Sequence, residues 1–270
     1  MVTVTRRLFL NAAAATALLA QDVVRSSPSK PNARIAYGKD PAQFVDLRLP
    51  AGPGPHPVLI FIHGGFWSKA YTLDHASDTC AALTHAGAAT CNIEYRRIGD
   101  PGGGWPGTLE DVVHAAEHIV RVAPQYGLDA GRLIAAGHSA GGQLALWLAV
   151  QRVVDLRGVV GLAAISDLRR AWSLNLGDGA IGRFLGGPPE RVPQRYASAS
   201  PIELLPISVP QRMFHGTNDR VVPFEMSERF AHASQNAKLI PLKGAGHFDL
   251  IDPRYNEWKL IEKNLLNWDF

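Results

Sequence analysis

The chain is poor in cysteine and carries little excess of either charge. Among its 270 residues there are two cysteines, and 27 Lys and Arg stand against 24 Asp and Glu. The formal charge of +3, without a basic stripe, argues against a nucleic-acid partner. A disulfide between Cys80 and Cys91 is geometrically possible, since they fall in an expected helix and the strand after it. We expect two buried free thiols, because unpaired cysteine is a common core residue.

The sequence also lacks internal repeats, low-complexity segments and an apolar run long enough to cross a membrane. The apolar stretch at residues 8–20 is shorter than the ~20 residues that a spanning helix needs, so we expect no stable membrane anchoring. Arg6 and Arg7 precede it in a twin-arginine pattern, which is typical of an export signal. We therefore expect residues 1–20 to be an export signal to the periplasm or the exterior, and residues 21–33 a linker. Without a signal here, the protein would be cytoplasmic.

Residues 34–270 have the length and composition of one globular domain. The hydrophobic share of 46% and the charged share of 19% are ordinary. Strand patterns alternate with helical patterns, which predicts a mostly parallel sheet of about eight strands with helices on both faces. The expected strands are 34–37, 43–49, 57–62, 89–95, 132–136, 156–165, 211–215 and 238–242. The expected helices are 74–86, 108–126, 140–150, 223–234 and 256–268.

The strongest local motif is Gly-His-Ser-Ala-Gly-Gly at residues 137–142. An apolar strand precedes it and an apolar helix follows, which is the context of a nucleophile elbow. The glycines on either side of Ser139 leave room for neighbouring backbone in a sharp, strained turn. Ser139 is thus predicted to be a catalytic nucleophile.

A serine nucleophile needs a base, an acid that orients the base, and donors for an oxyanion. His247, in a loop after the last strand, is the expected base, and Asp219, after the preceding strand, the expected acid. The backbone N–H groups of Gly64, Gly65 and Ala140 are the expected oxyanion donors.

Other residues near these motifs admit alternative roles. Asp249 and Asp252 are close to His247 and are the next candidates for the acid, followed by Asp167. His63 is expected to fix the oxyanion loop, and His215 to order the Asp219 loop.

The substrate pocket is harder to place. Phe66 and Trp67 are predicted to line it, although either could pack beneath its own loop. His138 could line the pocket or simply fill space. Residues 168–198 look irregular and are a possible small cap insertion, whose aromatic side chains could wall a pocket or pack onto the body of the domain.

Six motifs together resemble the α/β-hydrolase superfamily, specifically its carboxylesterase and arylformamidase-like branch. They occur in the family's order over residues 34–268, and the order serine, acid, histidine is the one found on that fold. Phe66 replaces the third glycine of the lipase H-G-G-G motif, which is more similar to formamidases and feruloyl-esterase-like relatives. The motifs are residues 63–67 (HGGFW), 92–96 (NIEYR), 137–142 (GHSAGG), 199–202 (ASPI), 215–219 (HGTND) with 222–223 (VP), and 246–249 (GHFD).

The resemblance implies an α/β-hydrolase fold and hydrolysis of small carboxylic esters through an acyl-enzyme, without a cofactor. Its alternative is arylformamidase activity, the cleavage of the aryl amide N-formylkynurenine, although an export signal argues against a cytosolic catabolic role. Two further classes stay open. His114, Glu117 and His118 match an inverted zinc-peptidase motif on one helix, with a solvated helix face as the simpler interpretation. A non-catalytic hydrolase-fold binding protein would usually lack a member of the triad.

Overall fold

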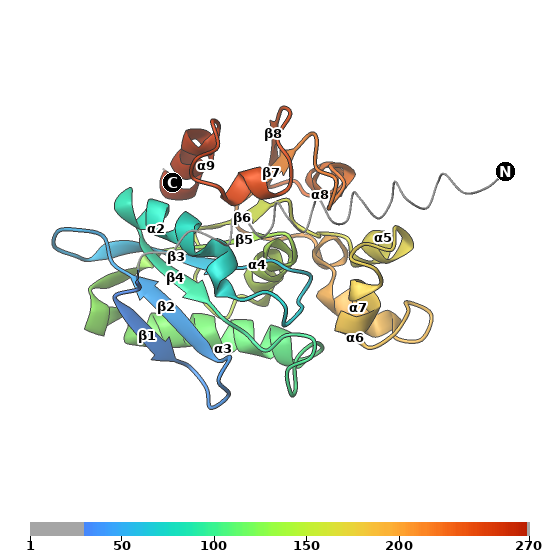
Figure 1. Ribbon diagram of the computed structural model, residues 1–270, viewed down its shortest axis with the longest axis horizontal. Coiled ribbons are helices and arrows are strands. Elements are labelled where there is room, and N and C mark those ends of the chain that lie inside the picture. Colours follow the sequence, from blue (N-terminus) through green and yellow to red (C-terminus); the bar gives the residue numbers. More distant parts are fainter. Residues whose placement is uncertain (1–29, 269–270) are drawn as a thin grey trace.

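A computed structural model describes residues 30–268 (Figure 1). The predicted export signal at residues 1–20, and residues 21–29 of the predicted linker, lie outside this range. Between residues 30 and 268, the helices are all too short or too polar to cross a membrane.

The described residues form one sheet of eight strands in the spatial order β1-β2-β4-β3-β5-β6-β7-β8 (Figure 1). β2 pairs antiparallel with both β1 and β4, and every other neighbouring pair is parallel. The predicted mostly parallel sheet is therefore confirmed. The strands are β1 (Ala33–Ala36), β2 (Phe44–Arg48), β3 (His56–Ile62), β4 (Ala89–Ile93), β5 (Leu128–His138), β6 (Gly158–Leu162), β7 (Gln211–Gly216) and β8 (Ala237–Leu242).

Helices cover both faces of the sheet, as expected from side chains that alternate along each strand. Val58, Ile60 and Ile62 of β3 join the core with α3, α4 and α8, whereas Leu59 and Phe61 face α2 and α9. The α-helices are α2 (Ser77–His85), α3 (Gly107–Val122), α4 (Ala140–Gln151), α5 (Leu168–Ser173), α6 (Ala180–Leu185), α7 (Pro193–Ala199), α8 (Glu225–Ala233) and α9 (Trp258–Leu266). Short 3-10 turns are η1 (Leu73–Ala76), η2 (Ala123–Tyr126), η3 (Pro201–Leu204) and η4 (Phe248–Ile251).

The helix expected at 74–86 is divided in two. Thr72 caps η1 by accepting from the Asp74 N–H, and Ala76 then departs from helical geometry at φ −116° before α2 begins. The cap of this segment is therefore Thr72, before the start of the expected helix. Gly127 ends the next helical segment, in the left-handed conformation at φ 62°.

The segment expected to be irregular, residues 168–198, instead contains α5, α6 and most of α7. These helices lie together at one side of the molecule (Figure 1). Phe184 and Leu185 are buried, and the Phe184 ring stacks on Trp67 with ring centroids 4.3 Å apart. These two side chains pack the segment onto the body of the domain. The short apolar stretches of the sequence do not reveal this packing.

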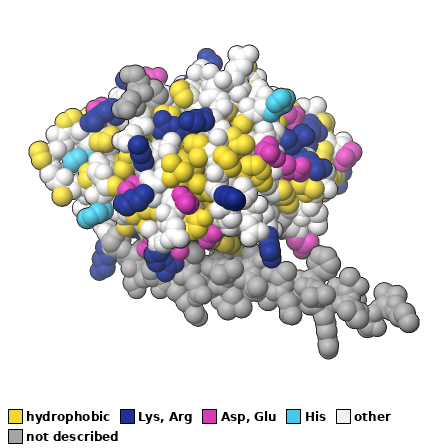
Figure 2. Space-filling model, turned by 90° about the horizontal axis from the view of Figure 1, so that it is seen from above, with side chains coloured by type: hydrophobic (Ala, Val, Ile, Leu, Met, Phe, Trp, Pro, Cys, Tyr) yellow, Lys and Arg dark blue, Asp and Glu magenta, His cyan; other side chains and the backbone are white. Residues whose placement is uncertain are grey.

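Charges of both signs are interspersed on the surface. On the face seen in Figure 2, Lys and Arg side chains alternate with Asp and Glu among apolar side chains. Positive and negative side chains are thus mixed over this face rather than separated by sign.

The two cysteines are free and buried, in α2 and β4. Burial raises the pKa of the Cys80 thiol to about 12 and also raises that of Cys91.

We predict that a thiol-reactive disulfide reagent modifies neither cysteine in the folded protein and both after unfolding in denaturant. A melting temperature that falls on addition of reductant, or fewer than two reactive thiols in denaturant without reductant, would contradict this.

Candidate active site

Ser139 occupies a sharp turn between β5 and α4. Its backbone is held at φ 56° and ψ −118°, and its N–H donates to the Leu162 carbonyl of β6 over 2.8 Å. A Cβ on Gly137 would lie 2.1 Å from the Gly141 oxygen, and one on Gly141 would lie 2.0 Å from the Ile62 oxygen. Both positions thus exclude any side chain. The strand, turn and helix predicted for the elbow are present.

Asp219 and His247 lie side by side although 28 positions separate them in sequence. The Nδ1–H of His247 donates to Asp219 Oδ2 over 2.7 Å, and both side chains are almost completely buried. The other carboxylate oxygen, Oδ1, accepts the N–H groups of Val221 and Val222 at 2.8 and 2.9 Å. This arrangement fixes the tautomer of His247, which leaves Nε2 as its acceptor nitrogen.

Asp219 is held in its ionised form. Burial alone would raise its pKa, but hydrogen bonds from His215 and His247 outweigh burial and hold the pKa of Asp219 well below its ordinary value. His215 Nε2 lies 3.3 Å from Asp219 Oδ2 and donates to the Val222 carbonyl over 2.9 Å. His215 therefore orders the Asp219 loop, as the sequence suggested.

The alternative acids have other partners. Asp249 accepts the Gly246 N–H, Asp252 pairs with Arg254, and Asp167 caps α5 and pairs with Arg229. Asp219 is therefore the carboxylate that pairs with His247.

The predicted oxyanion loop, residues 63–67, passes directly against the elbow. A Cβ on Gly64 would lie 2.8 Å from the His138 oxygen and 3.1 Å from Ser139 Cβ. Gly65, Phe66 and Trp67 all have positive φ, at 104°, 50° and 54°, so the backbone turns tightly here. Ala140 begins α4, where backbone N–H groups have no partner inside the helix.

His63 anchors this loop in the core. Its Nδ1 lies 2.8 Å from the Gly64 oxygen, and its Nε2 lies 3.0 Å from Glu94 Oε1. The ring stacks on Tyr95 with centroids 4.4 Å apart, and the Tyr95 hydroxyl donates to the His63 carbonyl. His63 thus has the structural role predicted for it. The sequence patterns did not predict the roles of Glu94 and Tyr95. A glutamate directly after a buried strand does indicate a buried carboxylate that needs a partner.

Two of the three predicted pocket residues do not face an open pocket, which corrects the prediction. Trp67 is fully buried, and its Nε1 donates to Gln143 Oε1 over 3.0 Å. His138 is also fully buried. Phe66 is partly exposed and packs against the backbone of Gly177, where a Cβ would meet its ring. Phe66 is the predicted residue that can still contact a substrate.

His138 instead supports the backbone of the candidate base. Its Nε2–H donates to the His247 carbonyl over 3.0 Å, and its Nδ1 accepts from His75 Nε2 over 3.1 Å. Burial, followed by the neighbouring His247, holds the pKa of His138 well below its ordinary value. Burial likewise lowers the pKa of His75 to about 3. Sequence patterns gave no sign that His75, in η1, would join this group.

The residues of the zinc-peptidase pattern lie on α3, at its solvent-facing side. His114 and Glu117 are exposed, and His118 Nδ1 accepts from Arg121 over 2.9 Å. Between residues 30 and 268, no group of three or more potential ligands is arranged to hold a metal ion.

The buried His75 predicts a loss of stability in acid. Its pKa is about 3 when folded and near 6.5 when unfolded, so between these values the unfolded chain binds the extra proton. Acidification from pH 7 to pH 5 should then cost about 2 kcal/mol of unfolding free energy through this residue. Urea denaturation at both pH values checks this, with His75→Gln losing that component. An identical pH dependence in the two proteins would refute it.

Comparisons with known proteins place this geometry in a family. The chain is 30% identical over 249 residues to the esterase LipC of Mycobacterium tuberculosis, covering 81% of this chain and 60% of LipC. It is 28% identical to a probable isoprenylcysteine alpha-carbonyl methylesterase of Arabidopsis thaliana, covering 80% of this chain and 50% of that protein. The chain thus spans between half and three fifths of these relatives.

Solved structures agree on the fold. A truncated carbohydrate esterase from gut microbiota superposes with a TM-score of 0.76 at 22% identity, covering 90% of this chain and 99% of its own. A bacterial heroin esterase superposes with a TM-score of 0.73 at 22% identity, covering 95% and 91%. The family model described as BD-FAE matches residues 45–233, and the chain therefore belongs to the BD-FAE family and has the α/β-hydrolase fold.

Proposed function

We propose that this protein is a serine carboxylesterase that cleaves small carboxylic esters through an acyl-enzyme on Ser139. The observations that carry the proposal are the strained turn at Ser139 against the predicted oxyanion loop and the buried Asp219–His247 pair. The His247 ring lies 4.4 Å, centroid to centroid, from the ring of His138, the residue before Ser139. Ser139 makes no capping bond to α4, so the helix does not occupy its hydroxyl.

In the first half of the proposed reaction, Ser139 Oγ attacks the ester carbonyl and His247 Nε2 takes its proton. The N–H groups of Gly64, Gly65 and Ala140 then receive the oxyanion, and the N-terminus of α4 adds a favourable dipole. His247 returns the proton to the departing alcohol. In the second half, water attacks the acyl-enzyme with His247 again as base, which releases the acid and restores Ser139.

The proposed cycle requires Asp219 to stay ionised. Because its pKa is held low, its carboxylate can stabilise the imidazolium that forms on His247 without taking the proton itself. His138 and His75 stay neutral beside His247, so they add little repulsion when that charge develops.

An ester is the proposed substrate class because the names of the similar proteins point there. LipC, the plant methylesterase and the carbohydrate esterase are all described as esterases. The HGGFW and GHFD motifs also resemble arylformamidases, which keeps N-formylkynurenine as a second candidate.

We also propose that the protein is exported through its twin-arginine segment. Replacing both Arg6 and Arg7 with Lys should leave the uncleaved precursor in the cytoplasm, measured by fractionation and immunoblotting. The matched control is Arg25→Lys, outside the twin-arginine pair. Equal export of both variants would reject this localisation.

Two substitutions test the catalytic roles. Ser139→Ala should lower kcat on a short-chain aryl acetate by about 10⁴-fold or more, because it removes the nucleophile. Asp219→Asn should lower kcat by about 10⁴-fold, because the amide favours the wrong tautomer of His247. Asp249→Asn is the control and should stay within a few-fold of the wild type. If Asp249→Asn is the damaging change instead, the assigned acid is wrong.

The substrate class is tested by kcat/KM on N-formylkynurenine and on the aryl acetate, with Ser139→Ala as the blank. We expect a preference for the ester. A large preference for the formamide would make the protein an arylformamidase and would count against export.

A further inference from the structure

The two ring nitrogens of His63 both face hydrogen-bond acceptors. Nδ1 lies 2.8 Å from the Gly64 carbonyl oxygen, which can only accept, so Nδ1 must carry a hydrogen. Nε2 lies 3.0 Å from Glu94 Oε1. A neutral imidazole would therefore turn the lone pair of Nε2 toward the carboxyl group.

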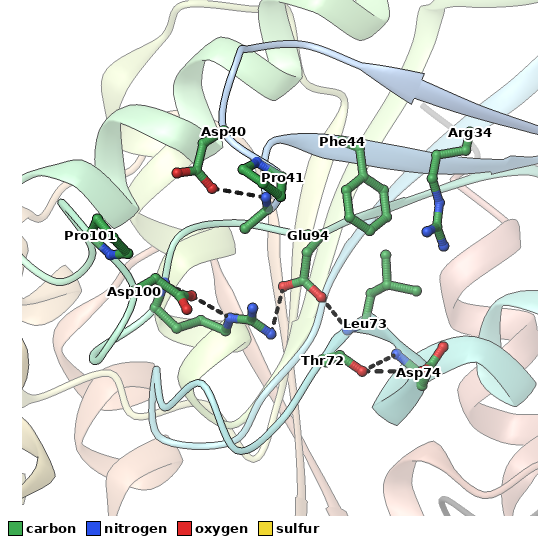
Figure 3. A pocket seen from close by; sticks show the side chains of 12 residues that line it. Arg34, Asp40, Pro41, Phe44, Thr72, Leu73, Asp74, Glu94, Asp100 and Pro101 are labelled. Carbon is green, nitrogen blue, oxygen red and sulfur yellow. Dashed lines mark hydrogen bonds and ion pairs between the residues drawn. The ribbon is translucent and has the colours of Figure 1, made fainter.

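The contacts of Glu94 favour the ionised form of its carboxyl group. Oε1 accepts the Tyr95 N–H at 3.1 Å and lies 3.3 Å from Arg97 Nη1, while Oε2 accepts the Leu73 N–H at 2.9 Å. Figure 3 shows one oxygen of the Glu94 carboxylate directed toward the backbone of Leu73. Burial alone would raise the pKa of Glu94, but its charged and hydrogen-bonding partners lower it, among them Arg97 and the Leu73 N–H.

Two of the other groups around His63, Tyr95 and His75, add no charge beside it. Tyr95 stacks on the ring, and burial raises its pKa well above the ordinary value. His75 stays neutral, because burial and then the neighbouring His63 lower its pKa to about 3. Arg97 is the other nearby cation, and it faces Glu94 and Asp100.

We propose that His63 is a buried imidazolium, held by Glu94, that polarises the oxyanion loop. The Gly64 carbonyl and the Gly65 N–H belong to one peptide group. A charge-assisted bond from His63 to that carbonyl draws electron density from the amide and makes the Gly65 N–H a stronger donor. His63 is thus a positioning and polarising residue that acts through Gly65, and Glu94 holds its charge. This inference rests on the esterase function proposed above.

Glu94 is buried in the protein but lines a cavity of about 480 Å³ together with Leu73, Arg97 and Asp100, seen in Figure 3. A small carboxylate from solution could therefore replace a truncated Glu94 side chain, which gives the proposal a test that separates charge from packing.

The charge on His63 is measured directly by ¹⁵N NMR of histidine-labelled protein at pH 8. We expect one ring with both nitrogens protonated in the wild type. This signal should be absent in His63→Asn and should change to a neutral ring in Glu94→Gln. A neutral His63 in the wild type would overturn the proposal. This readout does not depend on turnover, so it stands apart from a failure of the esterase assignment.

Kinetics then test the effect on the oxyanion. Glu94→Gln should lower kcat by about tenfold with little change in KM, the size expected when a charge-assisted hydrogen bond becomes a neutral one. Asp100→Asn removes a carboxylate from the same cavity and should leave kcat and KM within about twofold of the wild-type values. A rise in KM alone would contradict a role in the transition state.

Chemical rescue distinguishes charge from packing. Added formate should restore activity to Glu94→Ala, whereas formamide, which has nearly the same shape and no charge, should not. Equal rescue by both, or no rescue of a variant whose circular dichroism is native, would overturn the proposal. If Glu94→Ala does not fold, the NMR and kinetics of Glu94→Gln decide.

Discussion

The close approach of the α4 N-terminus to the ends of β3 and β5 is the constraint on which the rest of the site depends. A Cβ added to Gly137 or to Gly141 would lie about 2 Å from a neighbouring carbonyl oxygen, which is too close for any side chain. The backbone at Ser139 takes a positive φ of 56° in this turn, and Gly64 packs against the serine. A strained residue persists only where the surrounding structure determines it fully, and here the Leu162 carbonyl and α4 hold it from both sides.

A second layer of buried charge and hydrogen bonding surrounds that turn. The pKa of Asp219 is held low on one side, and the pKa of Glu94 is lowered on the other. Between them His138 and His75 stay neutral, because their imidazoles have no carboxylate partner and burial disfavours a proton. The two carboxylates have different roles. Asp219 orients the proposed base, and Glu94 holds the proposed charge on His63 behind the oxyanion loop.

Much of this could be predicted from sequence, because it depends on local patterns and chain order. Alternating apolar strands and helices predicted the sheet, and glycine spacing predicted the elbow. The pairing of His247 with Asp219 followed from their positions after successive strands. The burial of Trp67 could not be predicted, because it depends on Gln143 and Phe184, which are distant in sequence. The roles of Glu94 and His75 were hidden for the same reason: each acts through partners that only the fold brings near.

The measurement that tests the central claim most directly is mass spectrometry after treatment with a fluorophosphonate, which reacts with activated serines. We expect one adduct per chain, located on the peptide that contains Ser139, and none in Ser139→Ala. Labelling at another residue, or no labelling of folded wild-type protein, would contradict the claim that the strained turn holds an activated nucleophile.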